Sequence, residues 1–235
     1  MSQPFSQYDA RNYPTADIIT GYRQWAPVYD QTIYNELDLP LLERQQTITW
    51  SQIQRAADLG CGTGRIGQWL IHQGVKAIDG VDCSEAMLKV AIAKHIYTTW
   101  HIAEMTRTPL PTNAYNLVIT SLALCHLSKL ADFYQEADRL LSNGGFCVVI
   151  DYHPFFLIQG IPTHFETPSG ESIAIHNTVH LHSDHIQQGR QVNFQLLDMQ
   201  ERLVDLPWIN KRPNMAKYQH QPISFCMVWQ KNISS

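Results

Sequence analysis

The sequence predicts an α/β fold, namely a Rossmann-like, mostly parallel seven-stranded sheet flanked by helices, with the last strand antiparallel. Three observations predict it. Short apolar segments alternate with segments of helical periodicity between residues 55 and 151, and a glycine-rich loop follows the first apolar segment. Two more apolar segments, 194–203 and 223–230, lie too close together for a helical crossover between parallel strands. A chain of 235 residues is long enough to bury such a core.

The first half of this core contains two expected strand–helix units. Residues 56–59 form a short buried strand, and a helix follows through 66–71. Residues 77–82 form the next strand. Ser84 is expected to cap the helix after it, because its hydroxyl can accept a hydrogen bond from a free amide of the first turn. The apolar face of that helix consists of Met87, Leu88, Ala91 and Ile92.

The second half of the core contributes three more strands. Residues 97–103 are expected to form the third strand and 115–120 the fourth. A helix over 128–142 has apolar residues at helical spacing, and we expect it to stop at Asn143-Gly144-Gly145, where glycine favours a left-handed turn. Residues 146–150 form the fifth strand.

The chain is expected to form a single domain in four parts. Residues 1–50, rich in tyrosine and punctuated by proline, form an N-terminal cap of short helices and turns. Residues 55–151 form the core. Residues 152–190, rich in His, Pro and Gly, interrupt the alternation and are expected to form an inserted lid over the substrate. Residues 191–235 supply the C-terminal strands.

Composition and charge exclude several classes of protein. Hydrophobic residues make up 44% and charged residues 16%, so the chain is globular rather than disordered. The formal charge is −4, from 17 Lys+Arg against 21 Asp+Glu, without a basic run, which argues against a nucleic-acid partner. Five scattered cysteines and no secretory signal lead us to expect reduced thiols and a cytoplasmic location. Because no apolar segment reaches about 18 residues, we expect no membrane partner.

The glycine-rich loop indicates a nucleoside ligand. Asp58 to Gly64 reads D-L-G-C-G-T-G after a strand and before a helix, and Gly62 to Gly67 also fits G-x-G-x-x-G. Asp82 follows at the spacing of a ribose-binding acid. A nicotinamide cofactor is disfavoured, because Asp58 would repel a pyrophosphate and no Tyr-x-x-x-Lys pair is present. The alternatives are an NAD(P)-dependent oxidoreductase on a similar sheet, or a non-catalytic protein that binds the nucleoside.

These residues resemble the class I S-adenosylmethionine-dependent methyltransferases. The resemblance covers about residues 20 to 151. Asp58–Gly64 looks like the first motif of that family, and weaker likenesses follow along the chain. Asn116 and the missing proline before Gly144 depart from the family pattern. The matching segments are Trp25–Asp30, Gly80–Leu88, Ala103–Met105, Tyr115–Val118 and Leu140–Gly145.

The resemblance implies a binding site for S-adenosylmethionine, with S-adenosylhomocysteine as product. The loop would pass along the methionine end, where Asp58 favours its positive charge and Tyr29 lies over it. Asp82 would accept both ribose hydroxyls. Glu104 or the Met105 amide would read the adenine edge, with Cys83 and Met87 against its face. The implied cofactor-binding residues are Tyr29, Asp58, Gly60, Cys61, Gly62, Gly64, Asp82, Cys83, Met87, Glu104, Met105 and Leu122.

Three histidines are candidates for catalysis. Methyl transfer proceeds by in-line displacement and depends mainly on placement, although an oxygen or nitrogen acceptor can need a base. His126 follows the fourth strand, His153 the fifth, and His180 lies in the insertion; each has a purely structural alternative. Asp151-Tyr152-His153-Pro154 and the H-x-x-x-D segment starting at His180 resemble a small-molecule branch of the family.

The expected function is therefore transfer of a methyl group to a small-molecule oxygen or nitrogen acceptor. Macromolecular acceptors are disfavoured, because no Asn-Pro-Pro-Tyr follows the fourth strand. If residues 180–182 were extended, His180 and His182 would share a face, but no second spaced cluster accompanies them and the chemistry needs no metal. We expect no metal site. The sequence does not indicate the oligomeric state.

Overall fold

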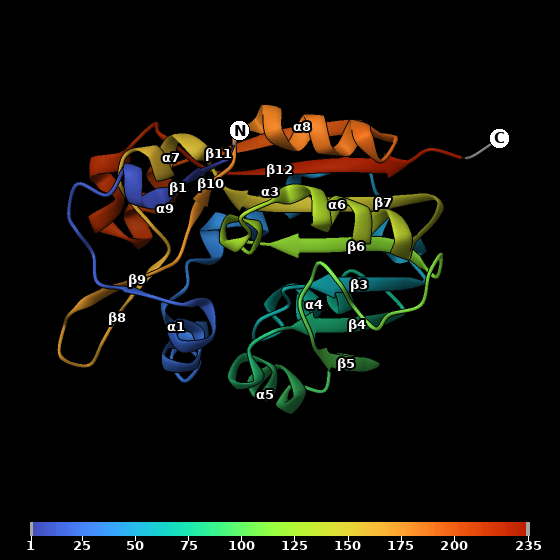
Figure 1. Cartoon of the computed structure of the whole chain (residues 1–235), viewed down its shortest axis with the longest axis horizontal. Helices are drawn as coiled ribbons and strands as arrows, with labels where there is room; N and C mark the ends of the chain where they lie inside the picture. The colour runs from blue at the N-terminus through green and yellow to red at the C-terminus, as the bar shows by residue number, and fades with distance from the viewer. Residues whose placement is uncertain (1, 234–235) are drawn as a thin grey trace.

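The computed structural model describes residues 2–233 and contains a seven-stranded sheet (Figure 1). The order is β11-β12-β7-β6-β3-β4-β5. Neighbours from β5 to β7 are parallel, whereas β12 is antiparallel to both β7 and β11, as the sequence predicts. The strands are β3 (Arg55–Leu59), β4 (Ala77–Asp82), β5 (Thr99–Ile102), β6 (Tyr115–Ser121), β7 (Leu141–Tyr152), β11 (Phe194–Leu203) and β12 (Pro222–Lys231).

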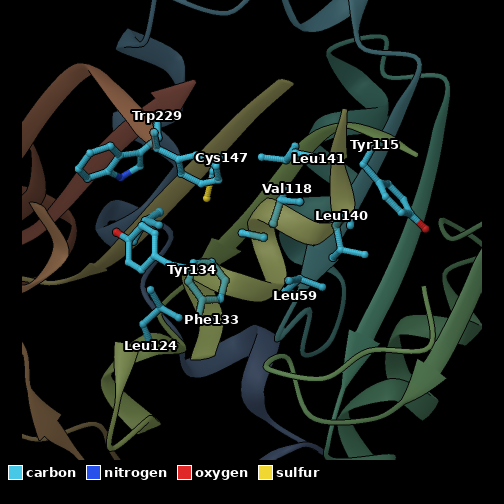
Figure 2. Close-up of a cluster of buried hydrophobic side chains, with 14 of the residues drawn as sticks. Leu59, Tyr115, Val118, Leu124, Phe133, Tyr134, Leu140, Leu141, Cys147 and Trp229 are labelled. Carbon is cyan, nitrogen blue, oxygen red and sulfur yellow. The ribbon is translucent and has the colours of Figure 1, made fainter. Parts of the chain in front are cut away.

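Two hydrophobic clusters cover the two faces of the sheet, because successive strand residues point to opposite sides. On one face Figure 2 shows Phe133 and Tyr134 packed towards Val118, Cys147 and Trp229. Helix α6 (Leu130–Leu140) supplies the first two, and α8 (His182–Gln191) packs beside it. On the other face, α4 (Arg65–His72) and α3 (Leu39–Arg44) pack against β3, β6 and β7.

One helix start follows the predicted chemistry, and one helix end does not. Ser84 caps α5 (Glu85–Ala93), since its Oγ accepts from Met87 N at 3.4 Å. The helix expected over 128–142 ends at Leu140, and residues 141–145 belong to β7. Leu141 already pairs with Tyr115, and Gly144, at φ +76°, lies in the irregular stretch before Phe146 pairs with Leu117. Pairing with β6 therefore ends the helix before the glycines.

The N-terminal segment and the insertion build one layer at the end of the sheet towards which β6 points (Figure 1). They share two small sheets. In one, β1 (Gln3–Pro4) pairs with β10 (Thr178–Val179). In the other, β9 (Ser172–Ile175) pairs with β2 (Thr15–Ala16) on one side and with β8 (His164–Glu166) on the other. Their helices are α1 (Ile18–Trp25), α2 (Tyr29–Thr32) and α7 (Pro154–Ile158), with α9 (Leu206–Lys211) beside them.

Five short 3-10 helices complete the described elements: η1 (Phe5–Gln7), η2 (Asn35–Leu37), η3 (Trp50–Gln52), η4 (Leu124–His126) and η5 (Pro213–Tyr218). The last part of the expected lid, α8, packs on the sheet, where Gly189 lies so close to Trp229 that a Cβ would come within 2.7 Å of the ring. Within residues 2–233, no helix has both the length and the apolarity needed to cross a bilayer.

Candidate cofactor and catalytic site

The glycine loop adopts a conformation that glycine alone adopts easily. Gly60, Gly62 and Gly64 have φ values of +70°, +53° and +82°, and α4 begins immediately afterwards. A Cβ on Gly60 would lie 2.5 Å from Cε of Met105, and one on Gly62 would lie 3.3 Å from Cε of Met87. The loop therefore presents bare backbone at the carboxyl end of β3, where a ligand can approach closely.

Asp82 lies at the end of β4 and holds the loop. Its Oδ2 accepts a hydrogen bond from Gly62 N and its Oδ1 accepts one from Ser84 N, both at 2.7 Å. Burial raises the pKa of this carboxyl, while the two amides oppose the rise. A carboxylate has about four acceptor sites, so each oxygen can still accept from a ligand hydroxyl. The position and the donor set fit the predicted ribose contact.

Asp58 lies beneath the loop and is almost fully buried. Burial raises the pKa of its carboxyl to about 7, although Tyr97 Oη donates to its Oδ2 at 2.8 Å. The Tyr97 ring also fills the space beside Gly67 and Gly80, where a Cβ would come within 2.8 and 3.0 Å of it. Tyr97 could not be identified from the sequence, because a tyrosine just before a strand carries no signal for a partner 39 residues away.

A small hollow of about 30 Å³ lies between the loop and the N-terminal segment. Five of the predicted cofactor residues line it: Tyr29, Asp58, Gly60, Cys61 and Gly62. Thr63, Arg65, Ile66 and Ser121 line it as well, and the sequence did not single them out. Small-molecule sites usually measure roughly 300–1,000 Å³. The N-terminal segment is therefore closed down on the loop.

Two acidic residues hold this closed arrangement, which we call the cap latch. Asp38 forms an ion pair with Arg65 and accepts from Ser121 Oγ at 3.0 Å. Asp30 accepts from Thr63 Oγ1 and pairs with Lys94 Nζ at 2.6 Å. The latch thus joins α2 and the start of α3 to the loop, α4 and α5.

The predicted adenine-side residues gather around the same loop. Met87 is buried and touches Gly62, and Met105 touches Gly60, as described above. Burial, Asp82 and then Glu104 raise the pKa of the Cys83 thiol to about 11, so Glu104 lies near Cys83 although its side chain is exposed. Leu122 packs in one cluster with Tyr29 and Met87 and has a positive φ of +56°, which is uncommon for leucine.

His126 is the predicted catalytic histidine that the fold brings next to this cluster. Its Nδ1 donates to the carbonyl of His176 at 2.7 Å, so Nε2 carries no proton and accepts from Tyr22 Oη at 2.7 Å. Burial lowers the pKa of His126 to about 4. Tyr22 lies edge-on to Tyr29, with ring centroids 6.2 Å apart. The sequence analysis did not single out Tyr22 as a partner of His126.

The other two histidines bond elsewhere. His180 donates from Nε2 to the carbonyl of Leu127 at 2.8 Å and accepts from Ser2 Oγ at Nδ1. His153 accepts from Phe155 N at Nδ1, which caps α7, and donates from Nε2 to Glu201 at 3.0 Å. The fold therefore brings His126, and neither His153 nor His180, into hydrogen-bond contact with the aromatic residues beside the loop.

Asp151 positions the element that carries His126. It is the second-last residue of β7 and accepts from Cys125 N at 2.6 Å, and burial raises the pKa of its carboxyl to about 7. Since Cys125 and His126 belong to the same 3-10 helix, this bond fixes η4 beside the end of β7.

This sheet order, with a glycine loop after its first strand and an acid ending the second, is typical of α/β folds that bind a nucleotide cofactor. Comparisons with known proteins identify the family. Residues 57–149 match the family model described as "Methyltransferase domain". Residues 57–149 therefore form a methyltransferase domain, and the fold is that of the class I S-adenosylmethionine-dependent methyltransferases.

Relatives match over part of their length. A malonyl-[acyl-carrier protein] O-methyltransferase of Legionella pneumophila is 30% identical over 135 residues, which cover 55% of this chain and 47% of that protein. A demethylmenaquinone methyltransferase of Tropheryma whipplei is 27% identical over 154 residues, covering 60% and 61%. The chain spans between 26% and 47% of the length of the first three curated relatives it matches.

Solved structures share the fold. An S-adenosylmethionine-dependent methyltransferase from Mesorhizobium loti superposes with a TM-score of 0.67 at 20% identity, covering 83% of this chain and 98% of that one. The DhpI–SAH complex gives 0.65 at 14% identity, covering 92% and 96%.

Proposed function

We propose that the chain transfers a methyl group from S-adenosylmethionine to an oxygen or nitrogen atom of a small molecule. The observation that carries the proposal is the 2.7 Å hydrogen bond between Tyr22 and His126. Tyr22 contacts Tyr29, and Tyr29 lines the hollow at the glycine loop. A polar pair able to accept a proton thus lies one aromatic ring from the proposed cofactor site.

The residues at the loop fit this cofactor. Asp82 offers free acceptor sites for two ribose hydroxyls, the glycines allow close backbone approach, and Asp58 supplies a carboxylate for a cationic group. When bound, S-adenosylmethionine supplies a methyl group on a sulfonium, which is a good leaving group. The protein then has to place the acceptor in line and exclude water.

Tyr22 and His126 are suited to take the proton that the acceptor loses. The acceptor proton would pass to Tyr22 Oη while the Tyr22 proton would pass to Nε2 of His126. With a pKa of about 4, Nε2 of His126 is unprotonated at neutral pH and free to accept, although burial makes it a weak base. The carbonyl of His176 accepts from Nδ1 and stabilises the charge that His126 gains.

The closed cap supports a small acceptor. Tyr29 of the N-terminal segment lines the hollow, and the cap latch holds that segment to the loop. Tyr22 and Trp25 of α1 stack on each other and both contact Tyr29, so an acceptor enclosed by the cap would lie against aromatic side chains. The chain also lacks a basic surface run, which nucleic-acid substrates favour.

The function is tested by measuring how much S-adenosylhomocysteine forms when the protein is incubated with S-adenosylmethionine and each of a panel of small hydroxy and amino compounds. With an active acceptor, Tyr22→Phe should lower kcat by about 100-fold, in the range for general acid–base catalysis, with KM for the cofactor unchanged. Tyr13→Phe is the matched control, because Tyr13 lies in the same segment and its hydroxyl accepts from Arg11.

Activity on proteins but on no small compound would contradict the small-molecule assignment. An unchanged kcat in Tyr22→Phe would remove the Tyr22–His126 pair from catalysis. Binding of S-adenosylhomocysteine without turnover on any acceptor would support a non-catalytic binding protein instead.

A further inference from the structure

Three metal-ligand side chains meet on the sheet face that carries α8, away from the glycine loop. His153 caps α7 after the end of β7, His182 is the first residue of α8, and Glu201 lies on β11. Their ligand atoms all lie within 4.8 Å of one another. We propose that His153, His182 and Glu201 bind a zinc ion that clamps the insertion to the C-terminal strands.

The spacing of the ligand atoms suits tetrahedral zinc. Nε2 of His153 lies 3.0 Å from Oε1 of Glu201, and Nδ1 of His182 lies 3.8 Å from the same oxygen. Zinc bonds of about 2.0–2.2 Å at tetrahedral angles place ligand atoms roughly 3.3–3.5 Å apart. These two distances bracket that value, and the two imidazole nitrogens are no more than 4.8 Å apart.

The surroundings hold both imidazoles in place. The ring of His182 packs edge-on against Phe225 and against His153, with centroids 4.6 and 4.7 Å away. Strand pairing places Glu201 beside Phe225 and Phe225 beside Asp151, which fixes the three supporting strands relative to one another. Glu201 is 48% exposed, so the site is open to solvent on one side and an ion can enter.

The donor set selects the kind of ion. Two imidazoles and one carboxylate favour zinc and similar late first-row divalent ions over calcium and magnesium, which prefer oxygen ligands. Three protein ligands leave the fourth position to water. In the described part of the chain, Nε2 of His182 is buried and has no hydrogen-bond partner. No hydrogen bond to Nε2 therefore determines whether the imidazole proton of His182 is on Nε2 or on Nδ1.

Zinc binding requires one rearrangement. In this structure Nδ1 of His153 accepts from Phe155 N, so the imidazole proton is on Nε2 and points at Glu201. A zinc ion at Nε2 displaces that proton to Nδ1, which then can no longer accept from Phe155 N. The hydrogen bond that caps α7 is lost, and the Phe155 amide becomes a reporter for the ion.

The experiment is a calorimetric titration of the full chain with zinc chloride after chelator treatment. We expect one equivalent to bind and the thermal midpoint to rise, because a ligand that binds the folded state stabilises it. His182→Ala and Glu201→Gln should each weaken binding at least about tenfold. His72→Ala and Glu171→Gln are the controls, since both residues are exposed and lie outside the cluster.

Hydrogen exchange at the Phe155 amide provides the second measurement. Exchange should become faster with zinc in the wild type and stay unchanged in Glu201→Gln. The side chain of Glu201 is about half exposed, so its replacement removes no core packing. Absence of a stoichiometric site, or wild-type affinity for zinc in both ligand variants, would overturn the proposal. Zinc binding with unchanged exchange at Phe155 would overturn the assignment of His153 as a ligand.

Discussion

Asp82 and Asp58 end neighbouring strands, yet their surroundings give them different tasks. Asp82 accepts from two backbone amides and keeps acceptor sites for a ligand. Asp58 is almost fully buried and receives a single side-chain hydrogen bond from Tyr97. The loop motif and its spacing to Asp82 predicted both acids. The hydroxyl that donates to Asp58 belongs to Tyr97, which no local sequence pattern indicates.

The raised pKa of Asp58 predicts a pH dependence of cofactor binding. The carboxyl has a pKa of about 7, so it is mostly neutral at pH 6 and mostly ionised at pH 8. Because the ionised form attracts the cationic methionine end, affinity for S-adenosylmethionine should rise by up to about tenfold between these values. Calorimetric titration at several pH values measures this, and Asp58→Asn should abolish the trend. An equal slope in that variant would assign the effect to another group.

Residue type and spacing did not identify which of the three candidate histidines lies beside the glycine loop. Each follows a strand or lies in the insertion, and their roles depend on distant partners: Tyr22 for His126, Glu201 for His153 and Ser2 for His180. These partners become neighbours through the packing of the N-terminal segment and β11. Residue type and spacing contain no information about such contacts.

At the scale of elements, the cap latch connects the N-terminal helices to the loop. Asp30 joins α2 to Thr63 and Lys94, and Asp38, just before α3, joins Arg65 and Ser121. The hollow behind it is far smaller than an ordinary ligand site. We infer that the cap must move for the cofactor to enter.

Removing the Asp30 contacts of the cap latch should make the movement of the cap faster. Asp30→Ala removes an ion pair whose partners are 36% and 23% exposed, which is worth about 0.4–1 kcal/mol. Association and dissociation of S-adenosylhomocysteine should each accelerate about two- to fivefold, as followed by stopped-flow tryptophan fluorescence. Lys89→Ala, which breaks an exposed pair with Glu85 on α5, is the control. Rates as slow as in the wild type would show that the cap does not limit entry.

Elements with their own pattern were predicted well, and elements defined by partners were not. The strands at 77–82 and 194–203 match β4 and β11 residue for residue. The insertion lacked a recognisable pattern, because β8, β9 and β10 are two to four residues long and pair with each other or with the N-terminus. Helix α6 ended early for a similar reason, since β6 already pairs with Leu141.

At the scale of the whole molecule, the strand order determines where the site lies. From β3 the chain builds outwards through β4 and β5, then returns to add β6 and β7 on the other side. Ligands of open α/β sheets bind at the carboxyl ends where the order reverses, and the glycine loop follows β3 at that point. The cap and insertion gather at this end (Figure 1). Alternating strands and helices predicted this arrangement, whereas the acceptor depends on side chains from the less regular layer above.

A calorimetric titration with S-adenosylhomocysteine, alongside one with NADH, tests the central claim most directly. The account predicts one equivalent of S-adenosylhomocysteine, no tight NADH binding, and a loss of about 1.5–3 kcal/mol in Asp82→Ala, as for a hydrogen bond to a charged group. Tight NADH binding without S-adenosylhomocysteine binding, or full affinity in a folded Asp82→Ala variant, would contradict it.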